Sequence, residues 1–439
     1  MFTGPAAAGR HGGVATALLV LVFGLAGSAR AAFVTNWSSS QAYPAARVSP
    51  VDYPRFYAVF LAGWRDVAMR DDGWVDLAAS LGAAPGDSLC AMVRALAQVD
   101  SAQVLRLDLA ASGAVRLFLN GGLVPPARGT GGYDLSLRPG RNEILLKVYS
   151  APGGWGFRVD ADRPLPPPRR VVGACRAAWE TPATFLTPES VLHDAGRGVL
   201  YVSSFDNQYE QRDRPTGYIS RLGLDGVLLD AQWITGLRAP CGMAIRGDRL
   251  FVAVREGVAE IDIPGGAVAA LHPIPDAVFL NDVAIDAQGR IYVSDTRPSL
   301  APPAVSVWRL SGQDFTPWLI DADVGRANGL LVVGDELLVG STQGGCLKAV
   351  NLESRAVRTV ISLGAGVVDG LRSDGRGGVL VSLWEGQLFH LDADGRLTEL
   401  LDFLPAQRNT ADFEYLPDRR LLLVPTFLAN TVAAFEVAP

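Results

Sequence analysis

The C-terminal part of the chain repeats one short apolar strand six times, and this repeat constrains the fold more than any other feature. Successive copies begin 50, 41, 46, 42 and 42 residues apart. The copies are LYVSS from Leu200, LFVAV from Leu250, IYVSD from Ile291, LLVGS from Leu337, VLVSL from Val379 and LLLVP from Leu421. Repeats of about 40 to 45 residues that contain only strands are typical of propeller blades. The sequence therefore predicts a six-bladed β-propeller over residues 184–439.

Such a propeller has to close into a ring, because an isolated four-stranded blade exposes two edges and cannot bury both faces. We expect the C-terminal strand at residues 432–437 to share a blade with a strand from residues 171–184. The sequence leaves open which segment makes this closure.

Residues 32–163 differ in pattern from the repeats and predict a β-sandwich. Short alternating runs, such as 104–109, 115–119 and 143–149, are separated by turn residues, which favours antiparallel strands. The segments VRLFLNG, LRPGRNEILLKVY and GGWGF resemble the galactose-binding-like jelly-roll modules that accompany many secreted bacterial enzymes. This resemblance implies a jelly-roll-like sandwich, for which contact with carbohydrate or a surface is one function to consider.

A functional face on this sandwich would need exposed aromatic side chains such as Trp64 or Trp74. Core packing is the favoured interpretation for both, since large aromatic residues are mostly buried.

The run PLPPPRR from Pro164 lacks most of the amide donors that a helix or sheet requires. It predicts a stiff linker within residues 164–183, leading into the propeller. The expected fold class is thus all-β, with an N-terminal jelly-roll-like β-sandwich and a C-terminal six-bladed β-propeller.

The N-terminus has the pattern of a secretory signal peptide over residues 1–31. Arg10 and His11 precede an apolar run at 14–27, and small residues flank a cleavage point after Ala31. The run is shorter than the roughly 20 apolar residues that a membrane-spanning helix needs. We therefore expect a secreted or periplasmic protein with no membrane span once the signal is removed.

Charge and cysteine content narrow the function classes. The formal net charge is −6, so nothing favours a nucleic-acid partner. The four cysteines show no CxxC pair and no zinc-like spacing, which leaves disulfides and free thiols both open. They are Cys90, Cys175, Cys241 and Cys346.

A polar residue precedes the first strand of most blades at the same phase. The distance from this position to the next repeated strand is 11, 9, 10, 9, 10 and 9 residues. The residues at this position are Glu189, Cys241, Asn281, Asn328, Asp369 and Asp412. Because the first strands line the central channel, residues at one phase converge at one mouth of it.

The polar members of this set are hard oxygen donors, which suit a divalent cation. The sequence predicts one such ion, with Ca²⁺ favoured and Mg²⁺, Mn²⁺ or Zn²⁺ as alternatives. The candidate metal ligands are Glu189, Asn281, Asn328 and Asp369, with Asp412 as an optional further ligand. The competing interpretation is that the Asn-Gly and Asp-Gly pairs are ordinary turn formers.

The segments PES, LND, ANG and DG at the starts of successive blades, with strands such as IYVSD after them, resemble the gluconolactonase/regucalcin-like family of six-bladed propellers. The resemblance covers about residues 184–438. It implies that Glu189, Asn328 and Asp369 bind a divalent cation and that Asn281 contacts metal or substrate. The sugar lactonases of that family carry an arginine two residues before this asparagine, where the present chain has Phe279. This departure points away from a sugar lactone and toward a more apolar ligand.

Two functions follow as hypotheses. The first is a metal-dependent hydrolase of lactones or esters, in which the ion activates water, Asp369 is the general base, and Asn281 and Phe279 contact a small-molecule substrate. No Gly-x-Ser-x-Gly segment supports a serine hydrolase. The second is a non-catalytic metal-containing propeller that serves as a platform for a ligand or a protein. His193 is expected to be structural.

Overall fold

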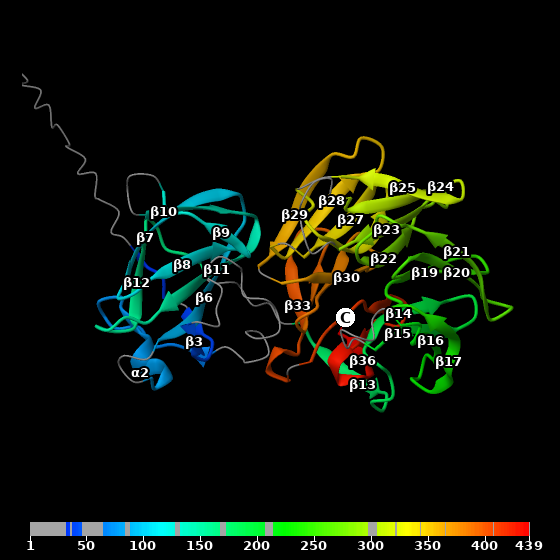
Figure 1. The fold of residues 1–439 in the computed structure, drawn as a ribbon, viewed down its shortest axis with the longest axis horizontal. Coiled ribbons are helices and arrows are strands. Elements are labelled where there is room, and N and C mark those ends of the chain that lie inside the picture. Colours follow the sequence, from blue (N-terminus) through cyan, green and yellow to red (C-terminus); the bar gives the residue numbers. More distant parts are fainter. Residues whose placement is uncertain are drawn as a thin grey trace, which may run out of the picture.

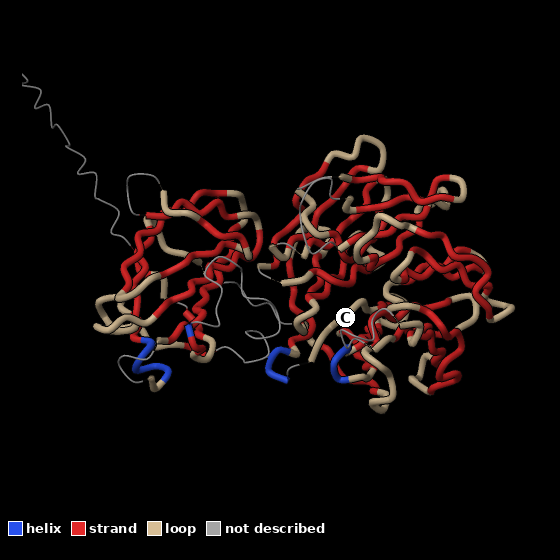
Figure 2. Tube along the Cα trace, viewed as in Figure 1, coloured by secondary structure: helices blue, strands red, loops and turns tan. Residues whose placement is uncertain are grey.

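The computed structural model shows a chain that is almost entirely β-structure, with the N-terminal sheets beside a ring of blades (Figure 1; Figure 2). The predicted signal peptide lies outside the described residues, as do Trp64 and residues 167–172 of the linker. The described residues are 32–35, 37–45, 65–83, 88–127, 132–166, 173–206, 214–296, 305–320, 323–342, 344–364, 366–406 and 408–438.

The predicted six blades are present, each as four antiparallel strands. The first blade comprises β14 (Pro188–Asp194), β15 (Val199–Ser204), β16 (Gly217–Gly223) and β17 (Leu228–Leu237), and the second comprises β18 (Met243–Arg246), β19 (Arg249–Val254), β20 (Gly257–Asp262) and β21 (Ala267–Pro273). The third comprises β22 (Leu280–Ile285), β23 (Ile291–Asp295), β24 (Val307–Ser311) and β25 (Asp314–Leu319), and the fourth comprises β26 (Ala327–Val333), β27 (Glu336–Ser341), β28 (Cys346–Asn351) and β29 (Val357–Leu363). The fifth comprises β30 (Val368–Ser373), β31 (Val379–Leu383), β32 (Gln387–Leu391) and β33 (Leu397–Asp402).

The sixth blade closes the ring with strands from both ends of the propeller. It has the order β34 (Glu414–Leu416), β35 (Leu421–Pro425), β36 (Val432–Val437) and β13 (Cys175–Glu180). Strand β13 pairs antiparallel with β36, from Cys175 opposite Val437 to Glu180 opposite Ala433. The segment that enters the propeller is thus its closing strand, as the ring argument required. The first strands of neighbouring blades contact one another all the way round, including β14 with β34, so they form the channel wall.

The repeated apolar strands are buried on both faces, which explains why they read as continuous apolar runs. All five residues of β31 and of β35 are buried. The cores lie between blades: one cluster joins Leu347 and Leu363 of one blade to Val381 and Phe389 of the next. Blade stacking, and not the single blade, therefore supplies the buried apolar area that stabilises the ring.

The N-terminal region consists of two sheets that enclose one core (Figure 1). The core draws Leu107 and Phe157 from one sheet and Val93 and Leu146 from the other. One sheet contains β1 (Ala32–Phe33), β12 (Gly156–Ala161), β7 (Gln103–Ala111), β10 (Gly132–Leu137) and β5 (Val75–Asp76). The other contains β11 (Gly140–Tyr149), β6 (Leu89–Val99), β2 (Trp37–Ser39), β4 (Arg65–Asp66), β3 (Tyr43–Pro44), β8 (Val115–Leu119) and β9 (Gly122–Val124).

The short helix α2 (Leu77–Leu81) follows β5 and is capped by the side chain of Asp76. Trp74 is half-buried, and a Cβ on Gly156 would lie 2.5 Å from its indole nitrogen, so this ring packs against the domain. The function of the N-terminal region, including contact with carbohydrate or a surface, stays a prediction.

One of the two N-terminal sheets, the one that contains β11, is continuous with the fourth blade of the propeller, which the sequence did not indicate. Strand β11 pairs in parallel with β29, the outer strand of the fourth blade, through Gly140 opposite Ser362 and Arg141 opposite Leu363. The Arg138 guanidinium also donates to the Cys346 sulfur at 2.9 Å. The two regions are therefore joined by backbone pairing in addition to the linker.

The parallel pairing at this junction depends on a glycine. Gly140 has φ of 96°, and a Cβ there would lie 2.4 Å from the Ser362 carbonyl oxygen. We predict that Gly140→Val destabilises the protein by about 1–3 kcal/mol through overpacking and backbone strain. It should also make the junction more sensitive to limited proteolysis. Gly153→Ala is the control, because a Cβ there meets nothing within 4 Å. Equal protease resistance in the two variants would contradict a glycine-dependent junction.

All four cysteines are free thiols, with Cys90, Cys241 and Cys346 buried. Burial raises the pKa of Cys90 to about 12, so this thiol is unreactive near neutral pH. Within the described part of the chain, no helix is long and apolar enough to cross a membrane.

Candidate functional site

The predicted site residues occupy equivalent positions in the channel wall. Glu189, Asn281, Asn328 and Asp369 are each the second residue of an inner strand, in β14, β22, β26 and β30. In each strand the pairing register shifts at that point, which marks a β-bulge. Bulges turn a side chain away from the ladder. The bulges thus explain how residues in a paired strand can present polar groups to the channel.

Serines of the second strands support three of these bulges. The hydroxyl of Ser203 accepts a hydrogen bond from the Ser190 amide at 3.1 Å, and Ser294 accepts one from the Asp282 amide at 2.9 Å. Ser382 accepts from the Gly370 amide at 2.8 Å. Each hydroxyl satisfies an N–H that the bulge removes from the ladder. The serine in the repeated strand sequence is therefore part of the site's scaffold.

Glu189 and Asp369 are both buried, and their carboxylates are close enough to interact electrostatically. They are 6% and 2% exposed. Burial raises the pKa of Glu189 well above its usual range, and the Asp369, Asp412 and Asp282 carboxylates raise it further. Burial, followed by Asp412 and Asp282, likewise raises the pKa of Asp369. Carboxylates from four blades therefore share one poorly solvated space and repel one another when ionised.

Three of the predicted metal ligands each have one side-chain oxygen without a hydrogen-bond partner in the described structure. Among the described residues, Glu189 Oε2, Asn328 Oδ1 and Asp369 Oδ2 are buried without a partner. The Asn328 side chain hydrogen-bonds to Asp369, which ties two of these residues together. Within the described residues no three Asp, Glu, His or Cys side chains form a metal-binding group, so the donor set is two carboxylates and an amide. Unsatisfied hard oxygens of this kind fit a Ca²⁺-type cation.

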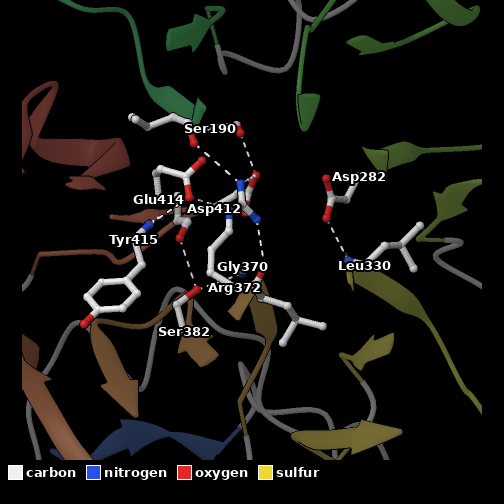
Figure 3. Close-up of polar contacts among 12 residues, drawn as sticks. Ser190, Asp282, Leu330, Gly370, Arg372, Ser382, Asp412, Glu414 and Tyr415 are labelled. Carbon is white, nitrogen blue, oxygen red and sulfur yellow. Dashed lines mark hydrogen bonds and ion pairs between the residues drawn. The ribbon is translucent and has the colours of Figure 1, made fainter. Parts of the chain in front are cut away.

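Asp412 differs from the other carboxylates because it already has a cationic partner (Figure 3). Its Oδ1 lies 3.0 Å from Arg372 Nη1, although outside hydrogen-bond geometry, and its Oδ2 accepts from Arg372 Nη2 at 3.2 Å. The Ser190 hydroxyl donates to the same Oδ2 at 2.5 Å. The residue is therefore held by the chain itself, unlike Glu189 and Asp369.

Asp282 also belongs to the site, although the sequence analysis did not select it. Its Oδ1 accepts from the Val283 amide and its Oδ2 from the Leu330 amide of the next blade, both at 2.7 Å (Figure 3). Burial, and then the Asp412 carboxylate, raises its pKa to about 8. A Cβ on Gly242 would lie 2.2 Å from its Oδ1. The pair Asn281-Asp282 at the start of a strand could have indicated this residue, but the sequence analysis assigned a role only to Asn281.

The remaining predicted residues lie near this group in different roles. The Asn281 side chain is 5% exposed, and its carbonyl accepts from the Gly242 amide at 2.7 Å. Phe279 is half-buried, and its amide donates to Asp295 at 2.9 Å. The His193 amide donates to Glu414 at 3.1 Å, and its ring is half-buried.

Aromatic side chains gather at the end of the blades where the inner strands begin. Ser204 pairs with Pro188 and Leu383 pairs with Val368 in antiparallel strands, so Phe205 and Trp384 lie just beyond the starts of β14 and β30. The Phe205 amide donates to the Leu186 carbonyl at 3.0 Å, and the Trp384 amide donates to the Val367 carbonyl at 2.9 Å. Phe427 packs between them, with ring centroids 6.3 Å from Phe205 and 5.6 Å from Trp384.

This aromatic group, Phe205, Trp384 and Phe427, belongs to one apolar cluster that Phe279 also contacts. Phe205 and Phe427 are buried. An apolar cluster therefore packs at the end of the blades where the inner strands β14 and β30 begin.

The raised pKa values predict a pH dependence for the metal-free protein. A carboxyl group whose pKa is higher in the folded than in the unfolded state stabilises the fold at low pH, and this contribution is lost as the pH rises through the folded value. For Asp282 this loss extends from about 4, the unfolded value, to about 8. We expect the Tm in chelator to fall between about pH 5 and 8, and Asp369→Asn to flatten the fall. A Tm that rises across this range would contradict the assignment.

Comparisons with known proteins bear on this site. The sequence model of the SMP-30/Gluconolactonase/LRE-like region matches residues 187–419. A comparison with curated proteins finds no match. The chain therefore has a family match across its propeller and no matching curated relative.

Similar solved structures include three with low identity. The extracellular domain of the putative one component system BT4673 from B. thetaiotaomicron has a TM-score of 0.38 at 12% identity, over 66% of this chain and 44% of that one. A luciferin-regenerating enzyme has a TM-score of 0.42 at 13% identity, over 61% and 95% of the two chains. The WD40 β-propeller domain of Doa1 has 0.42 at 14%, over 56% and 77%. The chain thus spans less than half of the first of these proteins.

Proposed function

Because the chain belongs to the SMP-30/gluconolactonase/LRE-like family, we propose that it is a metal-dependent hydrolase of lactones or esters. The observation that carries the proposal is the group of buried oxygens without partners, on Glu189, Asn328 and Asp369. In a dry channel such oxygens cost free energy unless a cation or a proton satisfies them. We assign these three residues as ligands of one divalent cation, with Ca²⁺ favoured over Mg²⁺, Mn²⁺ or Zn²⁺ because every donor is a hard oxygen.

The chain's own residues would divide the reaction between them. A bound divalent cation would supply Lewis-acid activation of a carbonyl and of water. Asp369, whose raised pKa brings it closer to neutrality, accepts the proton of the attacking water as general base. Asn281 is the second residue of β22, as Asp369 is of β30, and it orients the substrate or adds a ligand oxygen. Phe279 and the aromatic group exclude water from the mouth and contact the apolar part of the substrate.

We also propose that this hydrolase works outside the cytoplasm. The N-terminal segment has the features of a signal peptide, which supports a secreted or periplasmic hydrolase.

The second candidate is a non-catalytic platform for a ligand or a protein. Phe279 stands where the family's sugar lactonases hold the substrate with an arginine, and it packs against an apolar cluster that includes Phe205 and Phe427. A metal that serves only to stabilise the ring would also satisfy the orphaned oxygens. Activity measurements with and without cation distinguish these two functions.

We predict that the purified protein holds one equivalent of a divalent cation and hydrolyses aryl esters or lactones, and that chelation stops the hydrolysis. Asp369→Asn should lower kcat by about 10²–10⁴-fold, the usual contribution of a general base. Asp394→Asn is the matched control, since Asp394 is an exposed turn residue of the same blade. Steady-state kinetics and metal analysis by mass spectrometry provide the measurement. A protein with bound metal but no turnover across the substrate screen would favour the platform instead.

We predict a preference for apolar substrates. Lactones with alkyl or aryl substituents should have a higher kcat/KM than hydroxylated sugar lactones. Trp384→Ala should reduce kcat/KM for the apolar substrates roughly tenfold or more, because it removes an apolar contact surface. Trp233→Ala is the control, because Trp233 stacks on Tyr201 near the outer strand β17 and away from the mouth. Equal losses for apolar and sugar lactones would argue against a role in specificity.

A further inference from the structure

The channel holds a buried cation that belongs to the chain. Arg372 lies on β30, three residues after Asp369, and its side chain is 13% exposed. Its guanidinium reaches across the channel from the fifth blade to the sixth and first (Figure 3). Nη1 donates to the Leu371 carbonyl at 2.8 Å, and Nη2 approaches the Val191 carbonyl at 3.5 Å.

Two channel carboxylates share this arginine as their ion-pair partner. Asp412 meets the guanidinium with both oxygens, at 3.0 and 3.2 Å. Glu414 Oε1 lies 3.3 Å from Arg372 Nε. Glu414 is further satisfied by the Tyr415 amide at 2.8 Å and the His193 amide at 3.1 Å. A forked guanidinium that contacts two carboxylates is a strongly directional arrangement, which Lys could not reproduce in full.

The channel carboxylates therefore divide into two sets. Asp412 and Glu414 are compensated by Arg372, whereas Glu189 and Asp369 keep buried oxygens without a partner among the described residues. Both sets lie in one electrostatic environment, because Asp412 interacts with Glu189 and with Asp369. Among the described residues neither Glu189 nor Asp369 forms an ion pair, and Asp282, which also forms none, accepts hydrogen bonds from the Val283 and Leu330 amides.

We propose that Arg372 is a built-in counter-cation that limits the channel to one divalent ion and keeps Asp412 out of its ligand set. This inference rests on the metal centre proposed above. Without the guanidinium, Asp412 and Glu414 would be two buried carboxylates without a cationic partner, two residues apart at the start of the inner strand of the sixth blade. That pair has the chemistry of a second hard-oxygen cation site. Arg372 thus acts as a positioning residue, through Asp412, and has no assigned contact with substrate.

The test is metal stoichiometry and thermal stability of the full chain, with Ca²⁺ as the probe. The wild type and Arg372→Lys should each bind one equivalent by isothermal titration and metal analysis. Arg372→Met should have a lower Tm in chelator, should bind a second equivalent, and should gain more Tm from Ca²⁺ than the wild type does. Arg376→Met is the control, because Arg376 is exposed on the same blade, and it should behave as the wild type.

A triple variant separates charge from shape. Arg372→Met/Asp412→Asn/Glu414→Gln removes the guanidinium and both of the carboxylates that it compensates. It should regain most of the chelator Tm and return to one equivalent. If Arg372→Met alone cannot be recovered folded, the triple variant decides: a folded protein with one equivalent supports the counter-cation, and an unfolded one overturns it.

Other outcomes separate this inference from the metal centre. One equivalent in the wild type with the same stoichiometry, affinity and Tm in Arg372→Met would overturn the role of Arg372 and leave the metal centre intact. No bound ion in the wild type would overturn the metal centre, and the counter-cation with it.

Discussion

Repulsion among buried carboxylates is the constraint on which the rest of this structure depends. Glu189, Asp282, Asp369 and Asp412 come from four blades and meet in a channel where water is scarce. Such a group is stable only if protons, an internal cation or a metal ion offset the charge. The chain supplies Arg372 for Asp412 and backbone amides for Asp282. The remainder, on Glu189 and Asp369, is the part that calls for a ligand from outside.

The sequence predicted the ring and the register of this group, because both follow from periodicity. A six-fold repeat of apolar strands predicts six blades, and similar offsets of 11, 9 and 10 residues place Glu189, Asn328 and Asp369 at one mouth. The resemblance to a known family added roles for these residues, and the family match over residues 187–419 supports the family assignment. The sequence placed the strand that pairs with β36 within residues 171–184 but did not identify it. Two strands at opposite ends of the propeller sequence share no local pattern that would reveal their pairing.

The features that the sequence did not show depend on side-chain direction and on contacts between distant residues. The bulges in the four inner strands β14, β22, β26 and β30 do not show in an alternation pattern, which placed the site residues only at a strand end. Arg372 and Asp282 look like ordinary strand residues until the neighbouring blades bring Asp412 and Leu330 to them. The parallel pairing of β11 with β29 has no signal at all, because two residues on each strand carry it.

Ring closure by β13 also sets an order of events during synthesis. This strand is made before any other part of the propeller, yet its partner β36 is made last. Until β36 has been made, β13 has no partner in the sixth blade, and the core between the sixth and first blades is incomplete. Contacts between such distant segments form slowly and expose unpaired edges meanwhile. A nascent chain of this protein therefore closes its ring late. Loss of β13 would leave the edge of β36 open, and loss of β36 would leave the edge of β35 open.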